Sequence, residues 1–303
     1  MRRRTLLVAS AIACLVALGV VAAVALGSRG SDAVVTSRFA VATGGLQSLD
    51  PGADKVPATV AQSTTPTTPA APAPAPAPAA GAPLAGKVVA IDPGHNGGDG
   101  SHPDAINRLV DIGNGRKACD TAGAETASGY TESAYNLDVG LRVRRVLKKL
   151  GAKVVMTRTT DDGVGPCINK RAEIGNRAGA DAAVSIHADG GPSSGRGFHV
   201  IYPAPIAGLT TTIVKPSLRL AIDLRAAYGA GTGMPRADYI AQDGLDQRSD
   251  LGGLDLSKVP KVFIETGNMT NPTDAAKLED AGFREQAAKA IAAGIERFLR
   301  ASS

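Results

Sequence analysis

The stretch KVVAIDPGH, residues 87–95, is the part of the sequence from which the fold can be worked out. Its first six residues are mostly Val, Ala and Ile, which is typical of a short buried strand. The strand pattern stops at a Pro-Gly pair, and His95 follows directly. In open α/β sheets, binding sites lie beyond the carboxyl ends of the strands. The stretch therefore predicts one strand of a sheet and a candidate site residue at its end.

The rest of the second half of the chain repeats this strand pattern and alternates it with helical patterns. Further short apolar runs cover residues 153–158, 182–187, 198–203, 239–242 and 261–265. Helical periodicity covers residues 131–152, 168–180, 217–229 and 283–300. Apolar strands that alternate with helices favour a parallel sheet covered on both faces. We predict a single α/β domain with a mostly parallel twisted sheet of about six strands, flanked by helices on both faces.

The N-terminus has the plan of an export signal. Three arginines at 2–4 precede an uncharged, apolar run from residue 5 to residue 28. Residues 1–30 are therefore predicted to be a signal peptide that is cleaved or a signal anchor that is retained, and both alternatives stay open. In either case, the rest of the chain is exported across the cytoplasmic membrane. It would act in the periplasmic or cell-wall space, secreted or membrane-anchored.

A change of composition separates this leader from the predicted domain. Residues 31–86 are rich in Ala, Pro, Thr and Gly, including the run APAPAPAPAAG at 71–81. Such a segment buries too little apolar surface to fold and favours extended conformers. We predict a disordered linker over 31–86 and a catalytic domain over 87–303.

The net charge of the chain does not indicate nucleic-acid binding. The chain carries +5 at neutral pH, and the four arginines of the leader account for all but one of these charges. A nucleic-acid site would require Lys and Arg clustered on one face of the domain, and the sequence shows no such run. We therefore predict no nucleic-acid partner, and membrane contact only through an uncleaved N-terminal segment.

Three predicted strands end in residues with potential chemistry, namely His95, His187 and Glu265. A fourth candidate is Glu132, which falls in the first turn of the helix predicted over 131–152, where a carboxylate suits the helix dipole. Two histidines and one carboxylate form a ligand set of catalytic zinc sites. Taken alone, each residue could instead be structural, because histidines at strand ends are often only hydrogen-bonded.

Five motifs in this domain resemble those of the zinc-dependent N-acetylmuramoyl-L-alanine amidases, which cut peptide stems from peptidoglycan. They are VVAIDPGHNGG, TES at the helix start, VVMTRTTDD, KRAEIGNRAGADAAVSIHAD and VFIETGNMTNPTDAAKLED, in the family's order. The resemblance implies that His95, Glu132 and His187 bind one Zn²⁺ and that Glu265 is the catalytic glutamate. It also implies hydrolysis of the amide between N-acetylmuramic acid and L-alanine. A non-catalytic peptidoglycan-binding relative and a zinc hydrolase of another cell-wall amide are the alternatives.

Several residues around these motifs carry smaller expectations. Cys119 and Cys167 are the only cysteines outside the leader, and export favours a disulfide between them; free thiols or a cysteine metal ligand are the other interpretations. Asp92 either accepts a hydrogen bond from His95 or merely ends its strand. Neither His102 nor His199 is expected to bind metal. The implied partner is peptidoglycan or a muropeptide, and the chain is expected to be a monomer.

Overall fold

The computed structural model describes residues 81–302, so the predicted export segment and the linker up to residue 80 lie outside the described residues. The described strands are β1 (Val88–Pro93), β2 (Leu109–Asp111), β3 (Arg116–Ala118), β4 (Lys153–Met156), β5 (Ala182–Asp189), β6 (His199–Pro203), β7 (Leu245–Arg248) and β8 (Lys261–Asn268). The helices are η1 (Asp99–Ser101), α1 (Pro103–Ile106), α2 (Glu132–Lys149), α3 (Ile168–Arg177), α4 (Val214–Thr232), α5 (Gly252–Asp255), α6 (Pro272–Glu279) and α7 (Ala281–Ala301). None of the helices within 81–302 is long and apolar enough to span a bilayer.

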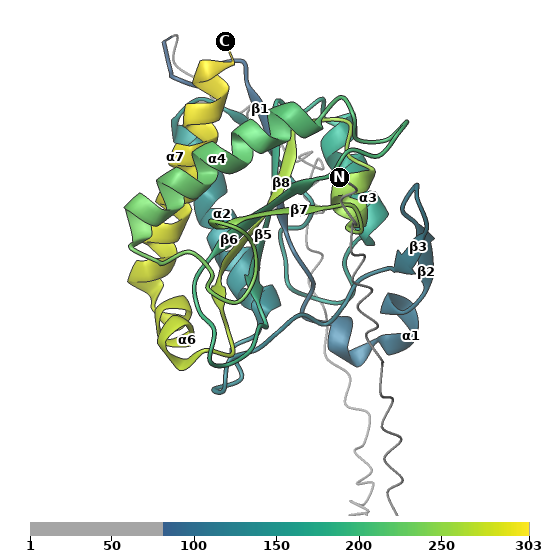
Figure 1. Ribbon diagram of the computed structural model, residues 1–303, viewed down its shortest axis with the longest axis vertical. Helices are drawn as coiled ribbons and strands as arrows, with labels where there is room; N and C mark the ends of the chain where they lie inside the picture. Colours follow the sequence, from purple (N-terminus) through teal and green to yellow (C-terminus); the bar gives the residue numbers. More distant parts are fainter. Residues whose placement is uncertain (1–80, 303) are drawn as a thin grey trace, which may run out of the picture. The chain divides into compact units, whose positions relative to one another are not determined.

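A six-stranded sheet has the strand order β4-β1-β5-β8-β6-β7. Figure 1 shows this sheet at the centre of the fold. The pairs β4/β1, β1/β5 and β5/β8 are parallel, and β6 pairs with β8 in the antiparallel sense. Because β7 is parallel to β6, these two strands run against the other four. The mostly parallel α/β architecture predicted from the sequence is confirmed. A separate hairpin, β2 with β3, lies within the segment between β1 and α2.

One strand prediction was wrong. Residues 239–242 form an irregular loop, and the edge strand is β7, a few residues later. The ring of Tyr239 packs against Gly191, and the Tyr239 hydroxyl donates to Asp189 Oδ2 over 2.9 Å. Ala241 has a φ of 70°, which is incompatible with a regular strand. The apolar run therefore anchors a loop instead of extending the sheet.

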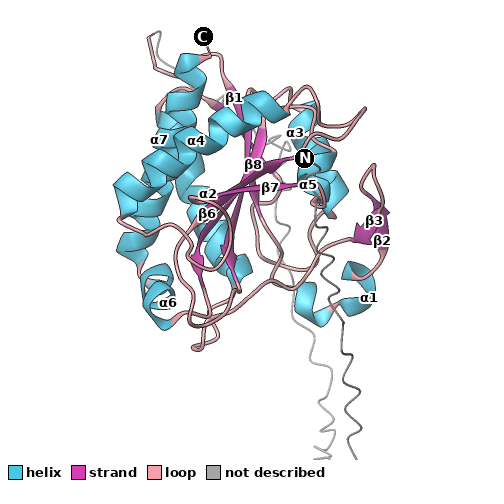
Figure 2. Cartoon of the chain, viewed as in Figure 1, coloured by secondary structure: helices cyan, strands magenta, loops and turns pink. Residues whose placement is uncertain are grey.

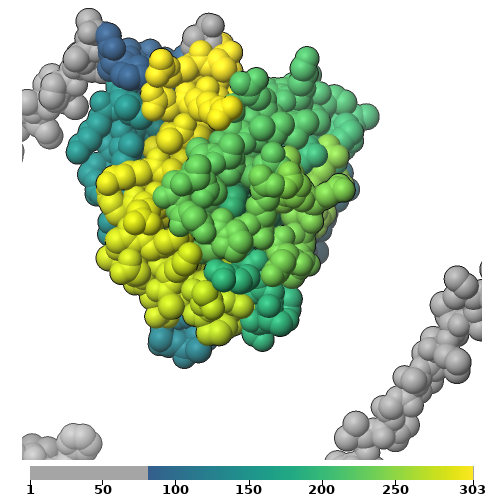
Figure 3. Space-filling view, turned by 60° about the vertical axis from the view of Figure 1, so that its left-hand side comes forward, coloured from purple at the N-terminus to yellow at the C-terminus, as the bar shows by residue number. Residues whose placement is uncertain are grey.

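The two faces of the sheet differ sharply in character, and Figure 2 shows the helices that cover them. Side chains alternate between the faces along each strand. One set, Val89, Ile91, Val184, Ile186, Val200, Val262 and Ile264, belongs to a buried apolar core shared with α2, α4 and α7. In Figure 3, α7 lies on the surface between α2 and α4. Burial of each such aliphatic side chain contributes about 1.5–3 kcal/mol, so this face stabilises the domain.

The opposite face carries polar residues and the smaller helices α3 and α5. Across the sheet, Asp92 pairs with Ser185, Ser185 with Phe263, and His187 with Glu265. Because paired residues of neighbouring strands share a face, these side chains line one side of the sheet. The strands therefore do not have two equally apolar faces, and the polar face holds the candidate site.

Local signals fix the ends of the helices that border this site. The hydroxyl of Thr131 accepts a hydrogen bond from Ala134 N–H and caps α2, so that Glu132 is the first residue of the helix. Asp280 caps α7 in the same way. Helix α6, which the sequence analysis did not predict, begins with Asn271 as its cap and a proline at its first position.

Candidate active site

His95, Glu132 and His187 converge on one point at the carboxyl ends of β1 and β5. Glu132 Oε1 lies 3.3 Å from His95 Nε2 and 3.0 Å from His187 Nδ1, and the two imidazole ring centres are 4.9 Å apart. One ligand atom from each of the three lies within 4.8 Å of the others. The structure thus brings together the three residues that the sequence analysis selected, although they come from the loop after β1, from β5 and from the first turn of α2.

The backbone at Gly94 and His95 allows the rings of His95 and His187 to lie close together. A Cβ on Gly94 would lie 2.0 Å from Cε1 of His187, so only glycine allows the His187 ring to approach. His95 itself has a φ of 57°, in the left-handed region that residues with side chains adopt at a cost of about 1–3 kcal/mol. The surrounding contacts must hold it there. Strain of this kind is concentrated at functional sites.

The partner that orients His95 is Asp120, not Asp92. His95 Nδ1 lies 2.8 Å from the Thr121 carbonyl oxygen, to which it donates, and 3.1 Å from Asp120 Oδ1. Asp92 instead bonds Thr157, Ser185, Arg171 and Lys261, so its expected contact with His95 does not occur. Asp120 lies in the segment between β1 and α2, directly after the β2–β3 hairpin, and no local pattern in that segment indicated its role.

His95 and Glu132 each keep one atom for the centre and use another for support. The N–H of Ala124 donates to Glu132 Oε2 over 2.8 Å, while Oε1 faces the histidines. Burial alone would raise the pKa of Glu132, but the two histidines outweigh burial and hold that pKa well below its usual value. The carboxyl group is therefore ionised, as a metal ligand requires.

This donor set fits zinc. Imidazole nitrogen and carboxylate oxygen are common zinc ligands, and a histidine ligand usually has its second nitrogen bonded to a carboxylate or a carbonyl. His95 has both kinds of partner. A second possible set of metal ligands consists of His95, Asp99 and Asp120. It suits a metal ion less well, because Asp120 already forms an ion pair with Arg171 at 3.0 Å.

Glu265 lies beside the three converging residues without joining them. It is directly opposite His187 in the β5/β8 register, on the polar face of the sheet. Its Oε2 atom is buried and has no hydrogen-bond partner among the described residues. Burial and the negative charges of Glu132 and Asp189 raise the pKa of Glu265 well above its usual value. A buried carboxyl oxygen without a partner is unusual in a folded protein and points to use by a ligand.

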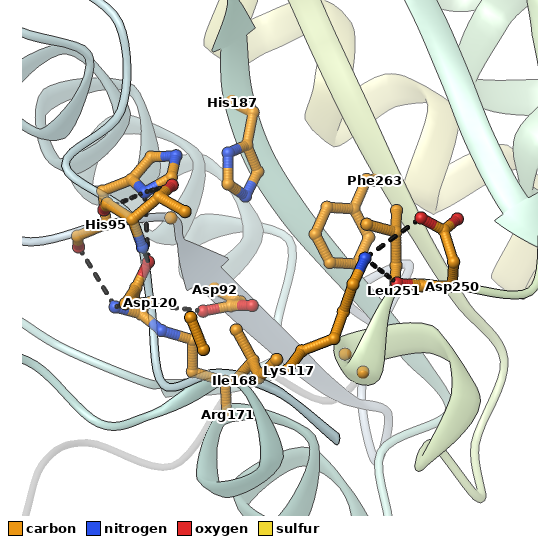
Figure 4. Close-up of a pocket in the computed structure, with 15 residues that line it drawn as sticks. Asp92, His95, Lys117, Asp120, Ile168, Arg171, His187, Asp250, Leu251 and Phe263 are labelled. Atoms are coloured by element: carbon orange, nitrogen blue, oxygen red, sulfur yellow. Dashed lines mark hydrogen bonds and ion pairs between the residues drawn. The ribbon is translucent and has the colours of Figure 1, made fainter. Parts of the chain in front are cut away.

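Two hollows meet at the histidines. An open groove of about 650 Å³ is bordered by His95, Glu132, His187, Asp189, Glu265 and Thr270. An inner pocket, about 220 Å³ in volume, lies on the other side of the histidines and is shown in Figure 4. There, the Phe263 ring stacks on His187 with ring centres 5.2 Å apart, and Lys117 reaches Asp250 over 3.0 Å.

A buried ionic network supports the floor of the inner pocket. Arg171 contacts Asp92 over 3.1 Å and Asp120 over 3.0 Å, and Lys261 contacts Asp92 over 3.3 Å. All four side chains are buried. Burial alone would raise the pKa of Asp92, but Lys261 and Arg171 hold it far below its usual value. The network therefore keeps its charges and links β1, α3 and β8 beneath His95.

The predicted disulfide between Cys119 and Cys167 is confirmed. It joins the end of the β2–β3 hairpin to the residue that precedes α3. Because Asp120 follows Cys119 directly, the bridge fixes the segment that supplies the partner of His95. The other two histidines are not among the converging residues. His102 is exposed in the segment between β1 and α2, and His199 is buried on β6.

The domain matches one protein-family model and a curated relative. The family model for N-acetylmuramoyl-L-alanine amidase matches residues 89–297. An N-acetylmuramoyl-L-alanine amidase of Mycobacterium tuberculosis is 45% identical over 219 residues, which are 72% of this chain and 88% of that protein.

Two solved structures are similar as well. The amidase Ami1 from Mycobacterium smegmatis superposes with a TM-score of 0.68 at 42% identity, over 73% of this chain and 99% of that one. Ami1 from Mycobacterium abscessus superposes with a TM-score of 0.67 at 44% identity, over 71% and 100% of the two chains.

Proposed function

Because the chain belongs to the N-acetylmuramoyl-L-alanine amidase family, we propose that it is a zinc-dependent hydrolase of the amide between N-acetylmuramic acid and L-alanine. The substrate would be peptidoglycan or a muropeptide released from it. One observation carries the proposal: three ligand-type side chains converge beside a half-buried glutamate, Glu265, one of whose carboxyl oxygens is buried and has no hydrogen-bond partner. That is the arrangement that metal-assisted amide hydrolysis requires.

Three side chains would hold the metal, through His95 Nε2, His187 Nδ1 and Glu132 Oε1. Zinc held by three protein ligands supplies a nucleophilic water near neutral pH and polarises a carbonyl group. Asp120 and the Thr121 carbonyl fix the orientation of His95 through its other nitrogen. These contacts leave the open groove as the side from which a substrate reaches the site.

Glu265 would move the proton. Its carboxylate accepts a proton from the attacking water as the C–O bond forms at the lactyl carbonyl. It then returns the proton to the nitrogen of L-alanine as the C–N bond breaks, which releases a carboxylic acid and an amine. General acid–base catalysis of this kind usually contributes about 10² to 10⁴ in rate. The place of Glu265 opposite His187 in the sheet supports this role.

The N-terminal region adds a proposal about location. Residues 1–30 would direct export, and the linker predicted over residues 31–86 would carry the catalytic domain away from the membrane or the cleavage site. Leu84, within the predicted linker, is already buried, and its N–H donates to the carbonyl of Leu150. Fractionation of cells that express the full chain tests this proposal, because a protein retained in the cytoplasm would contradict it.

Mass spectrometry of the products from defined muropeptides tests the proposed reaction. The purified protein, loaded with one equivalent of zinc, should release a peptide with a free L-alanine amino terminus and leave the lactyl carboxylate on the sugar. Chelation should stop the release, and added zinc should restore it. Cleavage within the peptide, or loss of an N-acetyl group, would identify a hydrolase of a different cell-wall amide. No product under any metal condition would indicate a non-catalytic relative.

A further inference from the structure

His199 stands next to Glu265 in the sheet. The antiparallel register of β6 and β8 pairs these two residues directly, so their side chains lie on the same face. Directly opposed residues in such a pair have Cβ atoms roughly 4.5–5.5 Å apart. His187 flanks Glu265 from β5 on the other side. Glu265 thus stands between a proposed zinc ligand and a second histidine to which no role has been assigned.

His199 is unsuited to bind the metal itself. The strand order β5-β8-β6 places His199 two strands away from His187. With strands about 4.8 Å apart, this separation is roughly 9–10 Å between backbones. His199 also belongs to neither of the two groups of possible ligand atoms that lie within 4.8 Å of one another in the described part of the chain. The histidine is therefore a neighbour of Glu265 and not a member of the ligand set.

Both side chains leave a buried polar atom without a partner. His199 is only 2% exposed, and its Nδ1 forms no hydrogen bond with any residue of the described part of the chain. The Oε2 atom of Glu265 is in the same state. Such atoms are rare in folded proteins, because each one costs about 1–3 kcal/mol. A donor and an acceptor that are both unpaired, on directly opposed residues, complement each other.

The aromatic neighbour of His199, Tyr239, does not offer this partner. The ring of Tyr239 meets His199 edge-on, with ring centres 6.5 Å apart, and its hydroxyl is already bonded to Asp189. Tyr239 therefore provides a wall that limits where the imidazole can turn. The carboxylate of Glu265 remains as the acceptor on the directly opposed residue.

We infer that His199 positions Glu265: the two side chains form no direct hydrogen bond in this structure, and the Nδ1–H of a neutral imidazole donates to the Glu265 carboxylate through one water. The inference rests on the proposed function, in which that carboxylate moves the proton. A carboxylate held by one donor keeps its second oxygen in a fixed direction for the attacking water. His199 is thus a positioning residue, which acts on the reaction only through Glu265.

The electrostatics of β6 are consistent with a neutral histidine. Burial lowers the pKa of His199, and the positive charge of Arg248 acts in the same direction, whereas Asp189 and Asp246 oppose it. A neutral imidazole has a single N–H donor, so its direction depends on the tautomer. Pairing with Glu265 requires the proton on Nδ1.

Steady-state kinetics on a defined muropeptide test the inference with two variants. His199→Leu removes the donor and should lower kcat about tenfold to hundredfold, since a hydrogen bond to a charged group is lost. KM, zinc content and melting temperature should stay near the wild-type values. His199→Asn retains a donor close to the position of Nδ1 and should keep kcat within about threefold. The control, His102→Leu, removes an exposed histidine and should change nothing.

Three kinetic outcomes would overturn the inference. The first is a His199→Leu variant with kcat within twofold of wild type. The second is an equal loss of kcat in the Leu and Asn variants, which would indicate packing alone. The third is loss of zinc from either variant, which would mean that His199 supports the ligands.

Histidine NMR of the metal-free protein provides a readout that does not depend on turnover. The chain has only four histidines, so each ring can be assigned from single variants. His199 should be in the Nδ1–H tautomer, and its ring signals should shift in Glu265→Gln while those of His102 do not. An Nε2–H tautomer, or no response to Glu265→Gln, would contradict the pairing. If wild type releases no peptide, the proposed function fails, and the NMR result alone decides whether the two residues pair.

Discussion

Replacing Arg171 with methionine should strongly destabilise the domain. This guanidinium is 4% exposed and lies between Asp92 and Asp120, with nitrogen–oxygen distances of 3.1 and 3.0 Å. It also donates to the side chain of Asn96 and to the carbonyl oxygens of Pro93, His95 and Pro166. Methionine fills much of the same volume but leaves two buried carboxylates without their shared cation.

The size of the effect follows from what remains after the substitution. Breaking a buried ion pair by removing one partner typically costs about 3–5 kcal/mol. Asp92 would still have Lys261 at 3.3 Å and two hydroxyl donors, and Asp120 would keep His95. We therefore expect the lower end, a loss of about 3 kcal/mol in the free energy of unfolding. A domain of this kind has about 5–15 kcal/mol in total, so the loss is large.

Urea unfolding at pH 7 with the disulfide intact measures this loss. The neighbouring substitution Lys170→Met is a matched control, because Lys170 is 62% exposed and its ion pair with Glu173 should contribute no more than about 1 kcal/mol. Arg171→Lys should fall between the two, since one ammonium cannot reach both carboxylates as the guanidinium fork does. A loss below about 1 kcal/mol in Arg171→Met, or one equal to that of the control, would refute the assigned role of the network.

Three further substitutions test other parts of the structure. Gly94→Ala should abolish stoichiometric zinc binding, measured by elemental analysis, because the new Cβ would lie 2.0 Å from the β5 histidine ring; Gly100→Ala, with 3.7 Å to its nearest neighbour, should keep its zinc. The double substitution Cys119→Ser and Cys167→Ser removes the disulfide, which joins residues 48 positions apart. It should lower the free energy of unfolding by about 4 kcal/mol in the chain-entropy model, and equal stability of the double variant and wild type would contradict this expectation. Burial and the charge of Asp250 raise the pKa of Asp255 from 3.8 to about 6. Between these two pH values the native state binds a proton that the unfolded state has lost, so the free energy of unfolding falls as the pH rises from about 4 to 6. Asp255→Asn should therefore gain stability over wild type across that window and remain ahead at pH 7, whereas parallel pH profiles would disprove the shift.

Much of the fold could be predicted because its signals are local. The strand β1 was expected over 87–92 and spans Val88–Pro93, and the last helix was expected over 283–300 and spans Ala281–Ala301. Apolar periodicity alone determines such elements. The run at 239–242 misled this reasoning, because its tyrosine packs on a glycine loop that is distant in sequence. The reversal of β6 and β7 also depends on pairing between distant segments, which no local pattern encodes.

In the candidate site too, only the features that depend on local sequence patterns could be predicted. Residues at the carboxyl ends of parallel strands meet at one edge, so His95, His187 and Glu265 could be grouped before any coordinates were known. The contacts that support these side chains could not be predicted from the sequence. Asp120 reaches His95 through a contact between residues 25 positions apart in the sequence, and His199 becomes relevant only through its register opposite Glu265. A histidine inside an apolar strand gives no indication of which residue will stand across from it.

The most direct test of the account is the product spectrum of zinc-loaded Glu265→Gln on a defined muropeptide, measured with zinc content on the same sample. Glutamine keeps the shape of the side chain and removes the basic carboxylate. We predict one zinc per chain, as in wild type, and release of the L-alanine peptide reduced by at least about 10²-fold, because proton transfer is lost while the ligands remain. Full turnover at normal zinc content would contradict the role of Glu265, and loss of zinc would make Glu265 a ligand.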